Sequence, residues 1–263
     1  MRLLLLLLCW FAIHSTRAAS EIPIKIYTEE LLFLQIKAGN EATGFAVEVL
    51  RKTLEQAGLS GKIQFYPWAR AYRMVQSQPN SLLFSTRRTQ FRESKFIWAT
   101  PLFPEGYDAW YSALDLALIC SENFTTEITS LEQAKQYTLV GQRGDYLAEF
   151  ARHELEWPKS NITFTTQYSD TLSLLQKRRA DFLLLGKGAV AEVTSQLKIK
   201  NHSFKVCFEL KANHAQYYFA FNLKTNKEIV SRFRRGFDAL QASGEYQKLY
   251  QVWEEIANKA RQE

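Results

Sequence analysis

The sequence alternates short apolar strands with amphipathic helices, and this alternation restricts the fold more than any other feature. In its first run, strands are predicted at residues 22–27, 62–66 and 81–85, separated by a helix at 44–58 and by another that begins at Pro67. Because each connection carries a helix, the strands are expected to pair mainly in parallel. The chain is therefore predicted to be an α/β protein.

The same alternation starts again near Tyr137. Strands are predicted at residues 137–140, 162–164 and 182–185, with a short helix capped by Ser130, a helix through 146–150, and a helix at 171–179 capped by Asp170. Two helices close the chain, because apolar residues recur at helical spacing from Val230 to Leu240 and from Tyr246 to Ile256. Both apolar stripes predict core packing rather than a cofactor site.

Residues 1–20 have the organisation of a secretory signal peptide, with Arg2, an apolar run and then small residues, and cleavage is expected near residues 18–20. No later segment approaches the roughly 20 continuous apolar residues of a membrane span. Removing Arg2 and Arg17 lowers Lys+Arg from 33 to 31 against 27 acidic residues, a net charge of +4. This mild, dispersed charge predicts no nucleic-acid partner. An exported, periplasmic protein is expected.

Two cysteines, Cys120 and Cys207, follow the signal peptide. An oxidising compartment allows a disulfide between them, and two buried free thiols are an equal alternative. The histidines of this part of the chain, His153, His202 and His214, are isolated from one another. Neither a metal site nor a cofactor is expected.

The segment FSTRRTQFR, residues 84–92, follows the third predicted strand. Ligands of open α/β sheets bind outside the carboxyl ends of the strands, so this segment is expected to line a binding site rather than to form a solvated turn. Adjacent residues of an extended segment point to opposite sides. Ser85 and Arg87 are therefore expected to face the site together, and Arg88 to face solvent.

Several short motifs follow one another in a recognisable order. They are Gly44-Phe45 with Glu48; Ser85, Thr89 and Arg92 followed by Trp98 and Pro101; Ser130-Leu131-Glu132-Gln133; Ala180-Asp181; and Gly244-Glu245-Tyr246 with Trp253. In order and spacing this set resembles the periplasmic solute-binding proteins of the amino-acid-type family, the extracytoplasmic receptors of ABC importers. The resemblance covers essentially the whole chain after the signal peptide.

The resemblance implies a two-lobe, type II periplasmic-binding-protein fold, in which each lobe is a mixed, mostly parallel sheet flanked by helices. Lobe 1 would comprise residues 21–108 and 216–263, and lobe 2 residues 109–215. Hinge strands near 107–111 and 215–219 would join the lobes of a monomer. Bending at the hinge would close the lobes around the ligand.

In the resembled family, the positions of Thr89 and Arg92 bind the α-carboxylate of the ligand. A planar guanidinium offers two parallel donors that match a carboxylate. The structural alternative for Arg92 is an ion pair with Glu93 or another acid. Arg87 stands where the family usually has a small hydroxyl residue, and it is either a second cationic contact or a plain surface side chain.

Further contacts are expected on both lobes. Tyr27, Glu29, Trp68 and Arg70 would lie on the rim of lobe 1, where aromatic rings can stack on a flat, apolar or cationic ligand, although Trp68 packed beneath its helix is an equal alternative. On lobe 2 the resemblance places Gln142, Arg143 and Gly144 at the ligand, and Gly186 where the family has its amine-binding acid. Either Glu29 replaces that acid, or the arginines select a more anionic ligand.

The leading hypothesis is a non-catalytic receptor for a small carboxylate-bearing solute, an amino acid or a related organic acid, that delivers it to an ABC permease or a membrane sensor. The alternative is an enzyme on the same scaffold, such as a cyclohexadienyl-dehydratase-like lyase, with Glu29 or Asp145 as its acid or base. An exported interaction protein with a vestigial cleft is a third possibility.

Overall fold

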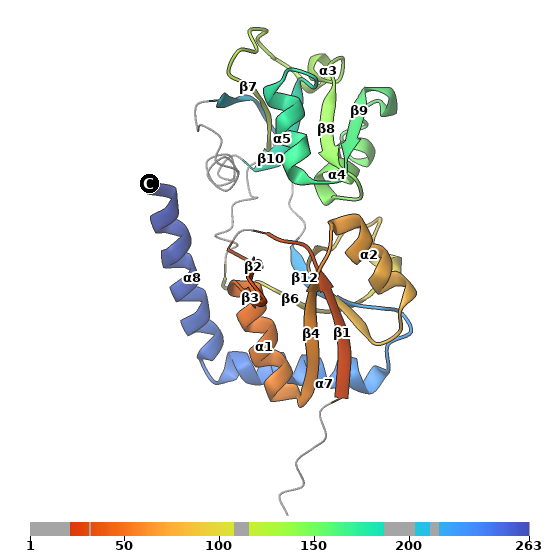
Figure 1. Ribbon diagram of the computed structural model, residues 1–263, viewed down its shortest axis with the longest axis vertical. Coiled ribbons are helices and arrows are strands. Elements are labelled where there is room, and N and C mark those ends of the chain that lie inside the picture. Colours follow the sequence, from red (N-terminus) through yellow and green to blue (C-terminus); the bar gives the residue numbers. More distant parts are fainter. Residues whose placement is uncertain (1–21, 32, 108–115, 187–202, 211–215, 263) are drawn as a thin grey trace, which may run out of the picture.

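The protein is described from a computed structural model, which covers residues 22–31, 33–107, 116–186, 203–210 and 216–262. The predicted signal peptide, residues 1–20, lies outside these residues. Figure 1 shows two α/β halves stacked along the long axis, with the C-terminal helices packed beside the N-terminal strands in the lower half. The middle of the chain forms the upper half. This is the two-lobe α/β arrangement expected from the sequence.

Lobe 1 is built on a sheet with the strand order β4-β1-β5-β12-β6. Its first three strands along the chain pair in parallel, and β12 runs antiparallel to both β5 and β6. The strands are β1 (Ile22–Thr28), β4 (Leu59–Phe65), β5 (Ser81–Arg87), β6 (Ile97–Pro101) and β12 (Tyr217–Phe221). The flanking elements are α1 (Phe45–Ala57), α2 (Trp68–Ser77), α7 (Lys227–Ala242), α8 (Glu245–Gln262), the 3₁₀ turn Glu93–Lys95 and the small hairpin β2 (Ile36–Ala38) and β3 (Glu41–Thr43).

Lobe 2 is built on a second sheet with the strand order β11-β7-β10-β8-β9. Strands β8, β9 and β10 pair in parallel, whereas β7 runs antiparallel to β10 and β11. The strands are β7 (Leu116–Ser121), β8 (Leu139–Gln142), β9 (Ile162–Thr165), β10 (Phe182–Gly186) and β11 (Phe204–Glu209). The helices are α3 (Leu131–Ala134), α4 (Tyr146–His153) and α5 (Tyr168–Gln176), with a 3₁₀ turn at Lys159–Asn161.

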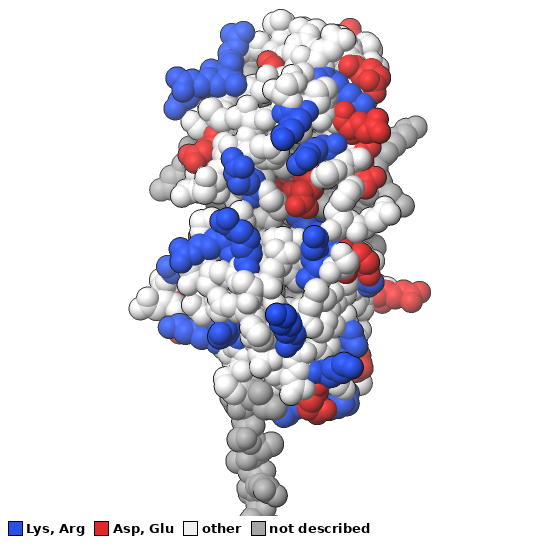
Figure 2. Space-filling model, turned by 90° about the vertical axis from the view of Figure 1, so that its right-hand side faces the viewer, with Lys and Arg blue, Asp and Glu red and all other residues white. Residues whose placement is uncertain are grey.

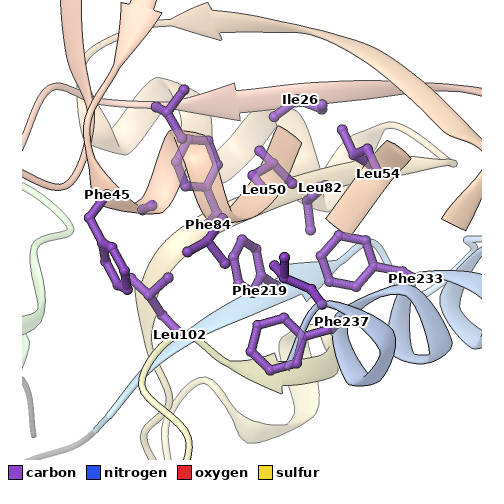
Figure 3. Close-up of a cluster of buried hydrophobic side chains, with 14 of the residues drawn as sticks. Ile26, Phe45, Leu50, Leu54, Leu82, Phe84, Leu102, Phe219, Phe233 and Phe237 are labelled. Atoms are coloured by element: carbon purple, nitrogen blue, oxygen red, sulfur yellow. The ribbon is translucent and has the colours of Figure 1, made fainter. Parts of the chain in front are cut away.

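An aromatic core fixes α1 and α7 against the first sheet. Figure 3 shows Phe84 of β5 and Phe219 of β12 lying among Phe45 of α1 and Phe233 and Phe237 of α7. Burying a Phe side chain contributes roughly 1.5–3 kcal/mol. This core joins the two ends of the chain in one lobe, because β12 and α7 come from the last fifth of the sequence and β5 and α1 from the first third.

Most of the predicted strands and helices are confirmed, with small shifts at their ends. One prediction was wrong: Asp170 does not cap α5, which begins at Tyr168 after Gln167 and carries Asp170 in its first turn. An acidic side chain in the first turn still interacts favourably with the helix dipole. The predicted strand at 137–140 begins two residues later, at Leu139, because the Thr138 amide donates to the Asp181 carboxylate instead.

The predicted lobe boundaries, 108/109 and 215/216, fall at residues outside the described part of the chain, and so does most of the predicted hinge segment 107–111. Residues 217–219 of the other hinge segment belong to β12 in the first sheet. In the parts of the chain that the structure covers, no helix has both the length and the apolar character of a bilayer span.

Cys120 of β7 and Cys207 of β11 form a disulfide bond, with their Cα atoms 5.9 Å apart. The two strands are neighbours in the second sheet. Of the two alternatives that the sequence left open for these cysteines, the structure has the disulfide.

Candidate ligand-binding site between the two lobes

The residues of the candidate site lie where the carboxyl ends of strands in the two lobes approach each other. Lobe 1 contributes the residues after β1 and β5 and the start of α2, and lobe 2 contributes the end of β8 and the start of α4. Local sequence positions both helices: α2 begins directly after Pro67, and Asp145 caps α4 by accepting a hydrogen bond from the Leu147 amide at 3.0 Å. Figure 2 shows the molecule narrowing between its halves, with basic side chains on both sides of the narrow zone.

Arg92 is the most deeply buried charged residue of this zone, with 1% of its side chain exposed. Its Nε and Nη2 atoms lie 2.9 and 2.8 Å from the same oxygen, Oε2, of Glu149 in α4. The Nη2 atom also donates to the Gly144 carbonyl at 3.0 Å. The guanidinium lies beside the neighbouring rings of Trp68 and Tyr72, at 5.3 Å from each centroid. Arg92 therefore holds a carboxylate of lobe 2 from an aromatic pocket of lobe 1.

Gly144 receives a second donor from lobe 1, the indole Nε1 of Trp68. Its φ of 76° lies in the left-handed region that glycine adopts without strain, and this conformation turns the backbone just before α4. One carbonyl oxygen of lobe 2 thus accepts hydrogen bonds from two side chains of lobe 1.

One face of α4 contacts the end of β5 and the segment that comes after it. Tyr146, Glu149 and His153 are spaced three and four residues apart, so they lie on the same side of the helix. The Arg87 guanidinium lies 4.8 Å from the Tyr146 ring centroid, and the Phe91 and His153 rings lie 4.2 Å apart. Together with the ion pair of Glu149, these contacts pack α4 against lobe 1 from the first residue of the helix to the last.

Arg87 is the second buried arginine of the zone. Its Nη2 atom donates to the Tyr217 hydroxyl at 3.2 Å, and its guanidinium lies 4.5 Å from the Tyr217 ring centroid. Only 6% of the residue is exposed. Arg87 is thus held by aromatic side chains from both lobes.

Three carboxyl groups surround these two arginines. Burial raises the pKa of Glu29 from 4.5 to about 8, the nearby Asp145 adds to the rise, and Gln142 and Arg92 oppose it. Burial also raises the pKa of Asp145 and of Glu149, and in both cases Arg92 opposes the rise. The Gln142 side-chain amide bridges the lobes by donating to Glu29 Oε2 at 3.4 Å. At neutral pH such a cluster retains a proton, with Glu29 as its main holder.

No protein-family profile and no curated protein matches the sequence. Solved structures do match. An ancestral arginine-binding protein bound to arginine aligns with a TM-score of 0.69 and 16% identity over 89% of this chain and 99% of its own. A histidine kinase sensor domain with similarity to periplasmic binding proteins aligns at 0.71 and 15% identity over 89% and 96%, and the substrate-binding protein of an amino acid ABC transporter at 0.67 and 17% identity over 88% and 98%.

The chain has the periplasmic-binding-protein fold. In this fold the ligand site implied by the resemblance is the zone between the lobes, and several predicted residues lie there: Glu29, Trp68, Arg87, Arg92, Gln142 and Gly144. Trp68 has the buried position that the alternative interpretation gave it, 3% exposed, and it also reaches across to lobe 2. For Arg92, the sequence left open an ion pair with Glu93 or another acid. The structure has such an ion pair, and the acid is Glu149.

Other predicted site residues of lobe 1 are used inside that lobe. The Ser85 hydroxyl donates to Gln35 Oε1 at 2.7 Å, and the Gln35 amide donates to the Thr28 hydroxyl at 3.1 Å, all in the buried interior. Tyr27 packs in the core beneath α2 and donates to Gln78 at 2.9 Å. The Thr89 hydroxyl accepts from the Arg92 amide at 3.3 Å and stabilises the turn after β5.

The remaining arginines do not add to the charge between the lobes. Arg70 is exposed above the Tyr66 ring, and Arg143 is exposed near the Phe164 ring. Arg88, expected to face solvent, is 40% exposed and forms a two-contact ion pair with Glu93. The positive charges of Arg87 and Arg92 are therefore matched by Glu149 and Asp145, with the protonated Glu29 beside them.

Gly186 ends β10 in register with Leu116 of β7. The residues that follow it, 187–202, lie outside the described part of the chain, so its predicted role as a ligand contact stays a prediction. In the described ranges, no group of three or more His, Cys, Asp and Glu side chains is arranged to hold a metal ion.

Sequence reasoning missed the lobe 2 residues that contact Arg87, Phe91 and Arg92, namely Tyr146, Glu149 and His153. A usable signal was present, because these three residues form one face of the helix that starts after Gly144-Asp145, at the carboxyl end of a predicted strand. Gln35 was missed because nothing in its local sequence indicates a partner 50 residues away.

Proposed function

We propose that the protein is an exported, periplasmic receptor that captures a small carboxylate-bearing solute between its two lobes. The observation that carries this proposal is the environment of Arg92: a guanidinium with 1% exposure whose Nε and Nη2 both donate to a carboxylate from the opposite lobe. A solute carboxylate in the position of the Glu149 carboxylate would receive the same two hydrogen bonds. Bonds to a charged group contribute roughly 1.5–3 kcal/mol each.

The aromatic surroundings support the same proposal. The adjacent rings of Trp68 and Tyr72 both lie against the Arg92 guanidinium, which restricts its movement before a ligand arrives. A pre-oriented guanidinium loses little side-chain entropy on binding. Arg87, which lies against the rings of Tyr146 and Tyr217, is proposed as the second cationic contact.

The partner is proposed to be an ABC permease or a membrane sensor. Structural neighbours support both kinds of partner, because one is the substrate-binding protein of an amino acid ABC transporter and another is a histidine kinase sensor domain. Their identities to this chain are 17% and 15%, so they support the two kinds of partner equally.

Ligand-induced thermal stabilisation tests the proposal. The chain without its signal peptide is stripped of bound solutes by unfolding and refolding, and its melting temperature is measured with a panel of amino acids and small organic acids. A binding carboxylate is expected to raise the melting temperature of the wild type and of Arg88→Ala, an exposed arginine, but not of Arg92→Ala. No shift with any member of the panel, or an equal shift in Arg92→Ala, would contradict the proposal.

A lyase on the same fold is the second candidate, and one observation favours it. The carboxyl of Glu29, whose pKa is raised to about 8, lies beside Asp145 between the lobes, and a carboxyl that holds a proton at neutral pH is suited to general acid catalysis. Incubation with a prephenate- or arogenate-like acid tests this candidate. Turnover that is lost in Glu29→Gln would establish it, and absence of turnover in the wild type would exclude this class of substrate.

A further inference from the structure

Glu149 supplies Arg92 with a carboxylate from within the same chain. We infer that Glu149 is an internal competitor of the solute: its ion pair with Arg92 clasps the lobes together when no solute is bound, and a solute carboxylate reaches Arg92 by displacing it. The displacement rests on the proposed function, whereas the clasp does not.

Arg92 and Glu149 differ in exposure, and this difference allows a solute carboxylate to take the place of Glu149. Arg92 is 1% exposed and is fixed by Trp68, Tyr72 and the Gly144 carbonyl, whereas 31% of the Glu149 side chain is exposed. Both Arg92 donors converge on a single oxygen of Glu149. Rotation of one partly exposed side chain into water therefore uncovers both donors, while the arginine stays in place for an incoming carboxylate.

The contacts around the ion pair make it part of an interface. On the same face of α4, Tyr146 contacts the Arg87 guanidinium on one side of Glu149 and His153 contacts Phe91 on the other. The Trp68 indole donates to the Gly144 carbonyl immediately before α4. Loss of the ion pair is thus expected to weaken the packing of α4 against lobe 1.

The energetic balance of the ion pair favours a reversible clasp. Burial raises the pKa of Glu149, so removing its carboxylate from water has a cost that the attraction to Arg92 must offset. In ion pairs with a buried partner these two effects are of similar size and nearly cancel. A solute that adds contacts of its own can therefore replace Glu149.

Small-angle X-ray scattering of solute-free protein tests the clasp. Glu149→Gln keeps the size of the side chain and removes its charge, and Glu154→Gln makes the same change at the exposed end of α4, away from the ion pair. Glu149→Gln is expected to raise the radius of gyration as the lobes open, with Glu154→Gln matching the wild type. An unchanged radius of gyration in folded Glu149→Gln, verified by circular dichroism, would overturn the clasp.

Calorimetric titration with the carboxylate found in the solute panel tests the displacement. Glu149→Gln is expected to bind it more tightly than the wild type, on the order of tenfold for the loss of one competing charged contact, and Glu154→Gln to bind it as the wild type does. Weaker binding by Glu149→Gln would overturn the displacement and place Glu149 in the solute-bound form. If no member of the panel binds, the proposed receptor function fails, but the scattering experiment still shows whether the Arg92–Glu149 ion pair holds the lobes together. The two proposals can therefore be tested independently.

Discussion

The carboxylate of Glu149 and the guanidinium of Arg92 join the two lobes through one oxygen, with Oε2 lying 2.9 Å from Nε and 2.8 Å from Nη2. The residues are 57 positions apart in the chain, Arg92 in the turn after β5 of lobe 1 and Glu149 in α4 of lobe 2. Arg92 is therefore both a carboxylate-binding group and a structural link. Mutation can separate these two roles.

Replacing Arg92 with Ala is expected to lower the free energy of unfolding by about 2–3 kcal/mol. This is below the 3–5 kcal/mol usual for breaking a fully buried ion pair, because the partly exposed Glu149 can turn to water. Urea unfolding measures the change. Arg88→Ala is the control, since its pair with Glu93 is exposed and contributes little to stability. Equal losses in the two variants would show that Arg92 is not a structural link.

Replacing Ser85 with Ala is expected to destabilise the protein by about 1–3 kcal/mol and to leave solute affinity unchanged. The Ser85 hydroxyl donates to buried Gln35, whose side-chain oxygen would lose this partner. Chemical denaturation and calorimetric titration give the two quantities, with Ser77→Ala at the exposed end of α2 as the control. A fall in solute affinity without a loss of stability would contradict this prediction and show that Ser85 contacts the solute.

Removing the disulfide by the double change Cys120→Ser and Cys207→Ser is expected to lower the free energy of unfolding by about 2–4 kcal/mol. The bond spans 87 residues and joins neighbouring strands of the second sheet, so its loss frees a large part of the unfolded chain. Unfolding of wild-type protein with and without a reductant checks the same effect, and the double variant serves as the control that should not respond. An equal midpoint in all four samples would contradict the prediction.

Glu29→Gln is expected to change how stability depends on pH. The folded protein raises the pKa of Glu29 from 4.5 to about 8, so this carboxyl favours the folded state at pH values below about 4.5, and that contribution is lost as the pH rises to about 8. At about 1.4 kcal/mol per unit the loss is at most roughly 5 kcal/mol, and solvent near this partly exposed side chain reduces it.

Unfolding measured from pH 5 to pH 8 should therefore show a steeper fall of stability in the wild type than in Glu29→Gln, whose amide does not titrate. Glu30→Gln, the same change at an exposed neighbour, should follow the wild type. Parallel pH profiles for wild type and Glu29→Gln would mean that Glu29 titrates alike in the folded and unfolded states.

The fold could be predicted because its signals are local. The fully buried run of β5 and the apolar face of α1 carry their periodicity in a few consecutive residues. The hairpin of β2 and β3 was missed although Gly39-Asn40 marks its turn, and so was β7, whose six residues are all buried.

The partners in the site were harder to predict because they depend on how the lobes meet. The role of Arg92 was suggested by the resemblance, but its partner Glu149 lies in helix α4 of the other lobe and is a neighbour only because the two lobes meet. The Ser85 hydroxyl likewise finds Gln35 through tertiary packing. Parity along β5 predicted that Ser85 and Arg87 face the site together, but Ser85 has a φ of 54° and donates to buried Gln35. Arg87 is buried and Arg88 is exposed.

The central claim is that the protein holds a solute carboxylate between its lobes through Arg92. Its most direct test is calorimetric titration of solute-free protein with the carboxylate that stabilises it in the panel and, separately, with the methyl ester of the same compound. We expect the acid to bind with one-to-one stoichiometry and the ester to bind at least on the order of tenfold more weakly, with this difference lost in Arg92→Ala. Equal binding of acid and ester by the wild type would contradict the claim.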